Sequence, residues 1–129
     1  MITRVRFIVF AIVVASIPGC SLIFSPEMCS ANVAPGLSVA VQDSASGAMI
    51  ASGTQLIARD GAYVESSSVP ANHPELDSST LQAAGERGGT YSVTVQKPGY
   101  RDWTRSNVRV TKGECHVNTV SLTALLQRI

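Results

Sequence analysis

Few residues in this 129-residue chain have the side chains and spacing that metal chemistry requires. The candidates are three cysteines, Cys20, Cys29 and Cys115, and two histidines, His73 and His116. A zinc site needs three or more ligands in fixed geometry, and neither histidine belongs to a recognised ligand spacing. We therefore expect no metal and no cofactor, with His73 in an exposed loop and His116 on a strand beside a cystine. The alternative is zinc held by both histidines and by carboxylates from several loops.

Serine is abundant, so a Ser–His–acid hydrolase is the other chemistry to consider. No Gly-x-Ser-x-Gly elbow occurs, the motif that exposes a nucleophilic serine on a sharp strand-to-helix turn. The serines instead fall in predicted turns and at outward strand positions. The sequence therefore predicts that the protein is not an enzyme, and a hydrolase of unfamiliar type is the weakest of the alternatives.

One cluster has the composition of a binding surface: Tyr100, Arg101, Trp103 and Arg105. Aromatic and arginine side chains are common anchors of protein interfaces, and the last three share a parity that would place them on one strand face. The competing interpretation is that Trp103 caps the core while the arginine stems pack over it. We favour the capping interpretation, because a sandwich with few aromatic residues needs its tryptophan inside.

The N-terminal residues resemble a bacterial export signal. Arg4 and Arg6 precede an apolar run over residues 7–15, and Ile-Pro-Gly then leads to Cys20. The run is too short to span a bilayer, so residues 1–19 are interpreted as a lipoprotein signal peptide with a signal helix. Cys20 is then the lipid-attachment residue, and residues 20–35 form a tether and entry segment. Pro18 departs from the usual residues at its position of the attachment motif.

Ordinary secretion is the rival interpretation, with cleavage near Cys29, Ser30 and Ala31. The cysteine count favours lipid attachment, because a modified Cys20 leaves Cys29 and Cys115 as a pair. Export would place that pair in an oxidising compartment, so we predict a disulfide between them. Two unpaired thiols are the alternative.

The charge balance argues against nucleic acid as a partner. The whole chain carries a formal charge of +1, and loss of the signal arginines leaves a mature chain of about −1 with no basic run. Contact with a membrane is therefore expected through the lipid alone.

Beyond residue 36 the pattern predicts an all-β body. Short alternating apolar runs lie between turn residues, among them Asp60-Gly61 and Lys97-Pro98-Gly99. A Ser-rich stretch over residues 66–80 is predicted to be a long loop. The last run changes parity, which predicts a β-bulge near residues 118–119. Expected strands cover residues 37–42, 49–59 with a break near 53, 62–65, 81–84, 90–96, 108–110 and 115–126.

Several of these runs resemble the carboxypeptidase regulatory-like domain. The resemblance is carried by Gly-Thr-Tyr-Ser-Val-Thr-Val at residues 89–95, Pro-Gly-Tyr at 98–100, Val108 with Val110, and Cys-His at 115–116. It covers residues 36–126 and implies a transthyretin-like Greek-key β-sandwich of about seven strands. Domains of this family accompany enzymes or receptors, or stand alone in bacterial lipoproteins, and have no catalytic residues of their own.

The resulting expectation is a non-enzymatic, lipid-anchored β-sandwich of the bacterial cell envelope that acts as an interaction or structural module. Ser21 stands where some bacteria use Asp to retain lipoproteins in the inner membrane, so we expect the outer membrane, facing the periplasm. Its partner would be an unidentified envelope protein. The alternative is a small-ligand or metal-binding accessory lipoprotein of the periplasm that uses the 66–80 loop and His73.

Overall fold

The computed structural model describes Gly19 and residues 28–129. The expected signal helix over residues 1–19, apart from Gly19, and the lipid-attachment residue Cys20 lie outside the described residues. Within the described residues, no helix has the length and hydropathy needed to cross a membrane.

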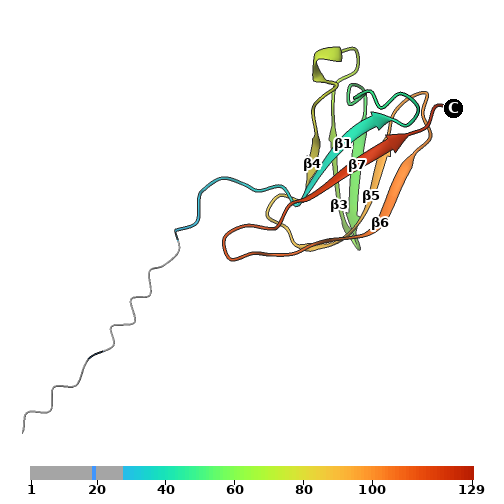
Figure 1. Ribbon diagram of the computed structural model, residues 1–129. Coiled ribbons are helices and arrows are strands. Elements are labelled where there is room, and N and C mark those ends of the chain that lie inside the picture. The colour runs from blue at the N-terminus through green and yellow to red at the C-terminus, as the bar shows by residue number, and fades with distance from the viewer. Residues whose placement is uncertain (1–18, 20–27) are drawn as a thin grey trace, which may run out of the picture.

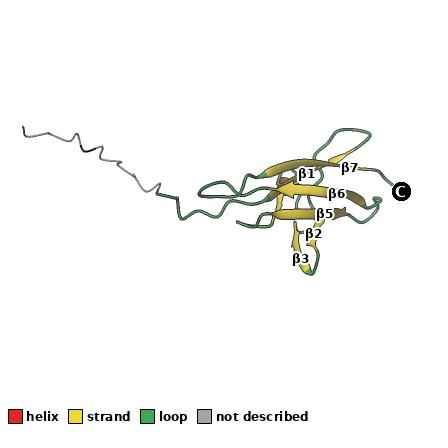
Figure 2. Cartoon of the chain, turned by 90° about the horizontal axis from the view of Figure 1, so that it is seen from below, coloured by secondary structure: helices red, strands yellow, loops and turns green. Residues whose placement is uncertain are grey.

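The described chain is all-β and forms two sheets (Figures 1 and 2). The smaller sheet has the strand order β4-β1-β7 and the larger has the order β3-β2-β5-β6. All pairings are antiparallel except that of β1 with β7, which run side by side in parallel from Leu37↔Val120 to Asp43↔Leu126. The elements are β1 (Leu37–Asp43), β2 (Gln55–Asp60), β3 (Tyr63–Ser68), the 3₁₀ turn η1 (Pro74–Leu76), β4 (Leu81–Ala83), β5 (Gly89–Gln96), β6 (Trp103–Val110) and β7 (Val120–Leu126).

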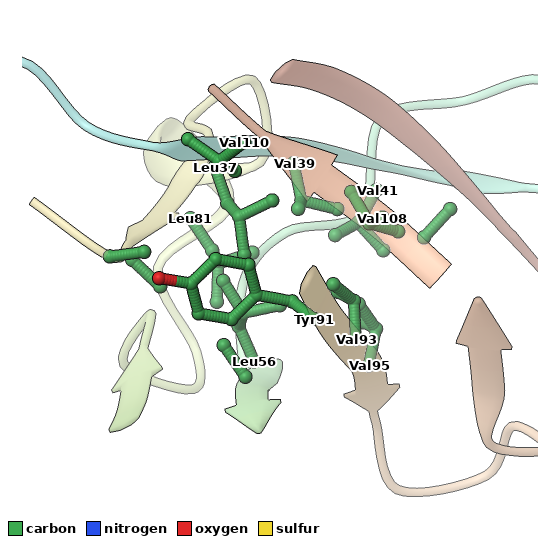
Figure 3. Packing of buried hydrophobic residues seen from close by; sticks show 14 of the residues in the cluster. Leu37, Val39, Val41, Leu56, Leu81, Tyr91, Val93, Val95, Val108 and Val110 are labelled. Atoms are coloured by element: carbon green, nitrogen blue, oxygen red, sulfur yellow. The ribbon is translucent and has the colours of Figure 1, made fainter. Parts of the chain in front are cut away.

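The core lies between the two sheets and follows the alternation of the sequence. In β1 the odd-numbered residues from Leu37 to Val41 are fully buried, and in β5 Tyr91, Val93 and Val95 are buried in the same way. Figure 3 shows these side chains meeting those of Leu56 and Val108 across the interior. Because each sheet buries only one face, removal of these side chains from water holds the layers together as a sandwich-like body.

The strand predictions are right in kind and wrong in four places. The strand expected over residues 108–110 begins at Trp103, because residues 103–105 pair with residues 93–95 of β5. The Ser-rich stretch begins as a strand, because β3 pairs residue for residue with β2 as far as Ser68. The second expected strand starts only at Gln55, and Met49 makes a single bridge to Gln42. The final strand starts at Val120, because residues 111–119 form a loop closed by the bridge between Lys112 and Val117.

The inward-facing positions change from odd to even numbers between Val117 and Val120 because this loop separates them. The structure instead has a register shift between β5 and β6, at Tyr91/Val93, where Asn107 of β6 adopts a positive φ of 56°. The shift keeps Val108 and Val110 directed into the core while Trp103 stays opposite Val95.

The entry segment joins the sandwich at the end where β1 and β7 both begin. Gly36 donates its N–H to the Ala84 carbonyl at 3.0 Å and accepts the N–H of Val120 at 2.8 Å. A Cβ at Gly36 would lie 2.7 Å from the Ala84 oxygen, so only glycine allows this close approach. The C-terminus leaves from the opposite end of the body (Figure 1).

Candidate functional site

An open hollow lies where the entry segment meets the loop between β6 and β7. Its volume is about 450 Å³, and it is lined by residues 30–33, Glu86 and residues 112–117. The predicted disulfide between Cys29 and Cys115 is confirmed and borders this hollow, with a Cα–Cα distance of 5.1 Å. It ties the entry segment directly to the 111–119 loop.

The disulfide brings the next residue of each segment together. Ser30 Oγ lies 2.9 Å from Nε2 of His116, and the other ring nitrogen, Nδ1, is hydrogen-bonded to Oε1 of Glu86. The His116 and Glu86 side chains are 28% and 33% exposed, whereas Ser30 lies at the surface. Ser30, His116 and Glu86 thus form a continuous chain of hydrogen bonds, here called the Ser–His–Glu chain.

Glu86 is held in place by the backbone around it. It sits between β4 and β5 with a positive φ of 51°, and its N–H donates to the Ala34 carbonyl at 2.9 Å. Its carboxylate accepts the N–H of Ala34 at 2.7 Å and that of Val117 at 3.3 Å. The Ala34 N–H and then the His116 ring hold the pKa of Glu86 below its usual value, so the carboxylate is ionised and fixed.

The Ser–His–Glu chain was not predicted from the sequence, although one feature of the sequence indicates the contact between Ser30 and His116. Cys29 precedes Ser30 and Cys115 precedes His116, so a disulfide between the cysteines implies that the serine and the histidine are neighbours. His116 does lie beside a cystine as expected, but in a loop and not on a strand. Nothing in the sequence links Glu86 to either residue, because their contact depends on how β4 and β5 are joined.

His73 lies elsewhere, immediately before η1, and its Nδ1 is 2.7 Å from Oε1 of Glu75. Both side chains of this pair are at least half exposed. The structure does not bring His73 and His116 together. Within residues 28–129, no three His, Cys, Asp or Glu side chains are grouped so that they could hold a metal ion.

The four candidate interaction residues do not form one surface cluster, although Trp103 and Arg105 lie side by side. The Tyr100 hydroxyl donates to Oδ2 of Asp43 at 3.0 Å, and Trp103 packs partly buried against the core. The Arg105 guanidinium lies 5.5 Å from the Trp103 ring centre. Arg101 donates its backbone N–H to the Gln127 carbonyl, and its side chain is exposed. Tyr100 and Trp103 thus serve the body of the domain, and the two arginines remain at the surface.

The chain matches no protein-family model and no curated protein sequence.

Proposed function

We propose that this protein is a bacterial lipoprotein whose body is a carboxypeptidase regulatory-like domain with transthyretin-like Greek-key topology. Two observations support this topology. The first strand, β1, pairs with the last, β7, and the chain passes from the larger sheet to the smaller at β4 and back again at β5. After β3 and β4, β5 returns antiparallel beside β2, and a fourth strand that returns beside the first by a long connection is characteristic of Greek keys.

The Cys29–Cys115 disulfide is the observation that carries the proposed location. Disulfides persist in the envelope and outside the cell and are rare in the reducing cytosol. Together with the export signal proposed for residues 1–19, this supports attachment through Cys20 to the outer membrane, facing the periplasm. In this proposal the domain acts chiefly through contact, as a structural or interaction module for an envelope partner.

Contacts of the entry segment with the body support a defined orientation of the domain relative to the membrane. From Cys29 onward the chain is fixed by the disulfide, by two backbone contacts of Ala34 with Glu86, and by Gly36 between Ala84 and Val120. The end bearing residues 84–88 and 111–119 would face the membrane. The opposite end, with Arg101 and Tyr100, would face away from it.

The anchor is tested by purifying the full chain from bacterial membranes and measuring the intact mass of its N-terminal peptide. We expect a peptide that begins at Cys20 and carries acyl chains, and we expect Cys20→Ser to abolish the acyl mass and release the protein from the membrane fraction. A mature chain that begins near Ser30 or Ala31 without acyl chains would refute the anchor.

The partner surface is tested by crosslinking in intact cells. The double variant Arg101→Glu/Arg105→Glu should lose the crosslinked species while remaining folded, because both side chains are exposed and loss of the Arg105 contact with Trp103 should cost under about 1 kcal/mol. Arg59→Glu, an equally exposed change on β2, is the matched control and should retain it. An unaltered crosslink in the double variant would exclude these arginines as partner contacts.

A further inference from the structure

We propose that the Ser–His–Glu chain is a nucleophilic site that accepts the acyl group of small esters at Ser30. This goes beyond the contact function proposed above and adds a reaction to the end of the domain where the tether enters. It rests on the geometry of Ser30, His116 and Glu86, and does not depend on the lipid anchor.

The order of the contacts is the order that activates a serine. In the neutral tautomer that donates its Nδ1 proton to the Glu86 carboxylate, Nε2 of His116 accepts from the Ser30 hydroxyl, whose oxygen lies 2.9 Å away. This is the arrangement in which histidine takes the proton of a serine and a carboxylate holds the ring in the required tautomer. The role follows from geometry, because such arrangements recur on unrelated folds.

The three side chains are positioned by elements outside themselves. The disulfide fixes the residues that precede Ser30 and His116, and backbone N–H groups of Ala34 and Val117 fix Glu86. Such external support is what keeps a reactive geometry from relaxing. Glu86 is therefore a positioning residue, while Ser30 and His116 would touch the substrate.

The hollow beside Ser30 offers room for a small acyl ester and is open to solvent water. Its volume is about 450 Å³, within the range of small-molecule sites. Asn32, two residues after Ser30, lines the same hollow. Its side-chain amide is a donor of the kind that stabilises the oxyanion formed during acyl transfer.

The reaction has two balanced steps. Ser30 Oγ bonds to the ester carbonyl carbon as its proton passes to His116 Nε2. The bond between the carbonyl carbon and the alkoxy oxygen then breaks. The leaving alkoxide takes the proton from His116 Nε2 and departs as an alcohol. Water attacks the acyl-Ser30 by the same route, releasing a carboxylic acid and restoring the serine.

The test uses the intact, oxidised protein and two probes, a biotinylated alkyl fluorophosphonate and p-nitrophenyl acetate. We expect one label per chain, located at Ser30 by peptide mass spectrometry, and release of p-nitrophenol above buffer. Ser30→Ala should abolish both while the disulfide and melting temperature persist. Ser66→Ala, an exposed serine of β3, is the matched control and should retain both.

Variants of the other two residues distinguish catalysis from support. His116→Gln should slow labelling about 100-fold or more. Glu86→Gln should slow labelling, because the carboxylate that orients the His116 ring is lost, and Glu86→Asp should restore part of the rate. A chain with an intact disulfide that shows no label, or equal labelling at Ser30 and Ser66, would overturn the proposal. The Cys20 peptide mass reports on the anchor separately.

Discussion

Asp43 is a buried carboxylate that joins three parts of the chain at the end of the body remote from the entry segment. Only 3% exposed, it accepts the N–H groups of Ala45 and Ser46 at 2.9 and 3.0 Å. Its second oxygen accepts the Tyr100 hydroxyl at 3.0 Å and Arg128 Nε at 3.1 Å. Both oxygens are thus occupied by donors, which holds the pKa of Asp43 well below its usual range, with the Ser46 N–H the largest cause and Arg128 the next.

Because the pKa of Asp43 is lowered in the folded protein, the ionised carboxylate stabilises the fold. A carboxyl with a depressed pKa stabilises the fold fully above its unfolded pKa near 4, and the contribution is lost as pH falls from there toward the folded pKa. We expect the melting temperature to drop as pH decreases below about 4. Asp43→Asn should lower it by about 5–10 °C at pH 7 and flatten its acid dependence. Thermal melts followed by circular dichroism between pH 2 and 7 measure both effects. Equal acid dependence in the parent and the variant would contradict this account.

The partner of a single residue could be predicted from the sequence only where the chemistry of its side chain allows one kind of partner. Cys29 and Cys115 could be paired by counting, because the third cysteine had another assigned fate. The partners of Asp43 and Glu86 could not, since backbone N–H groups are present at every position and only the folded path selects them. The left-handed φ of Glu86, unusual for this residue type, is likewise set by its surroundings.

Trp103 marks the start of β6, the outer strand of the larger sheet. It lies opposite Val95 in the register and packs against the core while remaining partly exposed. The adjacent Arg105 covers its ring at 5.5 Å. Trp103 therefore covers part of the core beside β5.

We expect Trp103→Ala to lower the free energy of unfolding by about 2 kcal/mol, less than a fully buried tryptophan would cost. Arg105→Ala, which removes only an exposed cover, should cost under about 1 kcal/mol. Urea unfolding followed by circular dichroism measures both. Unchanged stability of Trp103→Ala, with loss of the crosslinked partner, would instead make Trp103 an interface anchor.

Strands with a strict apolar alternation could be predicted from sequence, and strands whose stability comes from neighbours could not. The alternating valines of β5 determine its inner face without further information. In β3 serines replace most apolar residues, so its existence depends on the ladder with β2. The bulge expected at residues 118–119 was wrong because a loop, held by the 29–115 disulfide, gives the same change of parity.

The disulfide is the longest-range covalent constraint in the described molecule, joining residues 86 positions apart. A crosslink over so long a loop reduces the conformational entropy of the unfolded chain, which raises the free energy of unfolding by roughly 4–5 kcal/mol in the chain-entropy estimate. We expect Cys29→Ser/Cys115→Ser to lower the free energy of unfolding by about 2–5 kcal/mol.

Urea unfolding of both proteins, with and without dithiothreitol, measures this difference. Reductant should shift the parent toward the variant and leave the variant unchanged. Two thiols titrated in the unfolded, unreduced mature parent would contradict the bond.

The same crosslink determines how the domain would respond to mechanical tension applied through the entry segment. Force applied at Cys29 and at the C-terminus follows the shortest covalent path, which crosses the disulfide to Cys115 and continues along β7. Residues 30–114 lie off that covalent path, so they cannot add to its length while the disulfide is intact. At about 3.5 Å per residue, the fully extended path between these points is roughly 50 Å in the oxidised domain, against roughly 350 Å in the reduced one. Oxidation would thus convert an extensible domain into a short, nearly inextensible link.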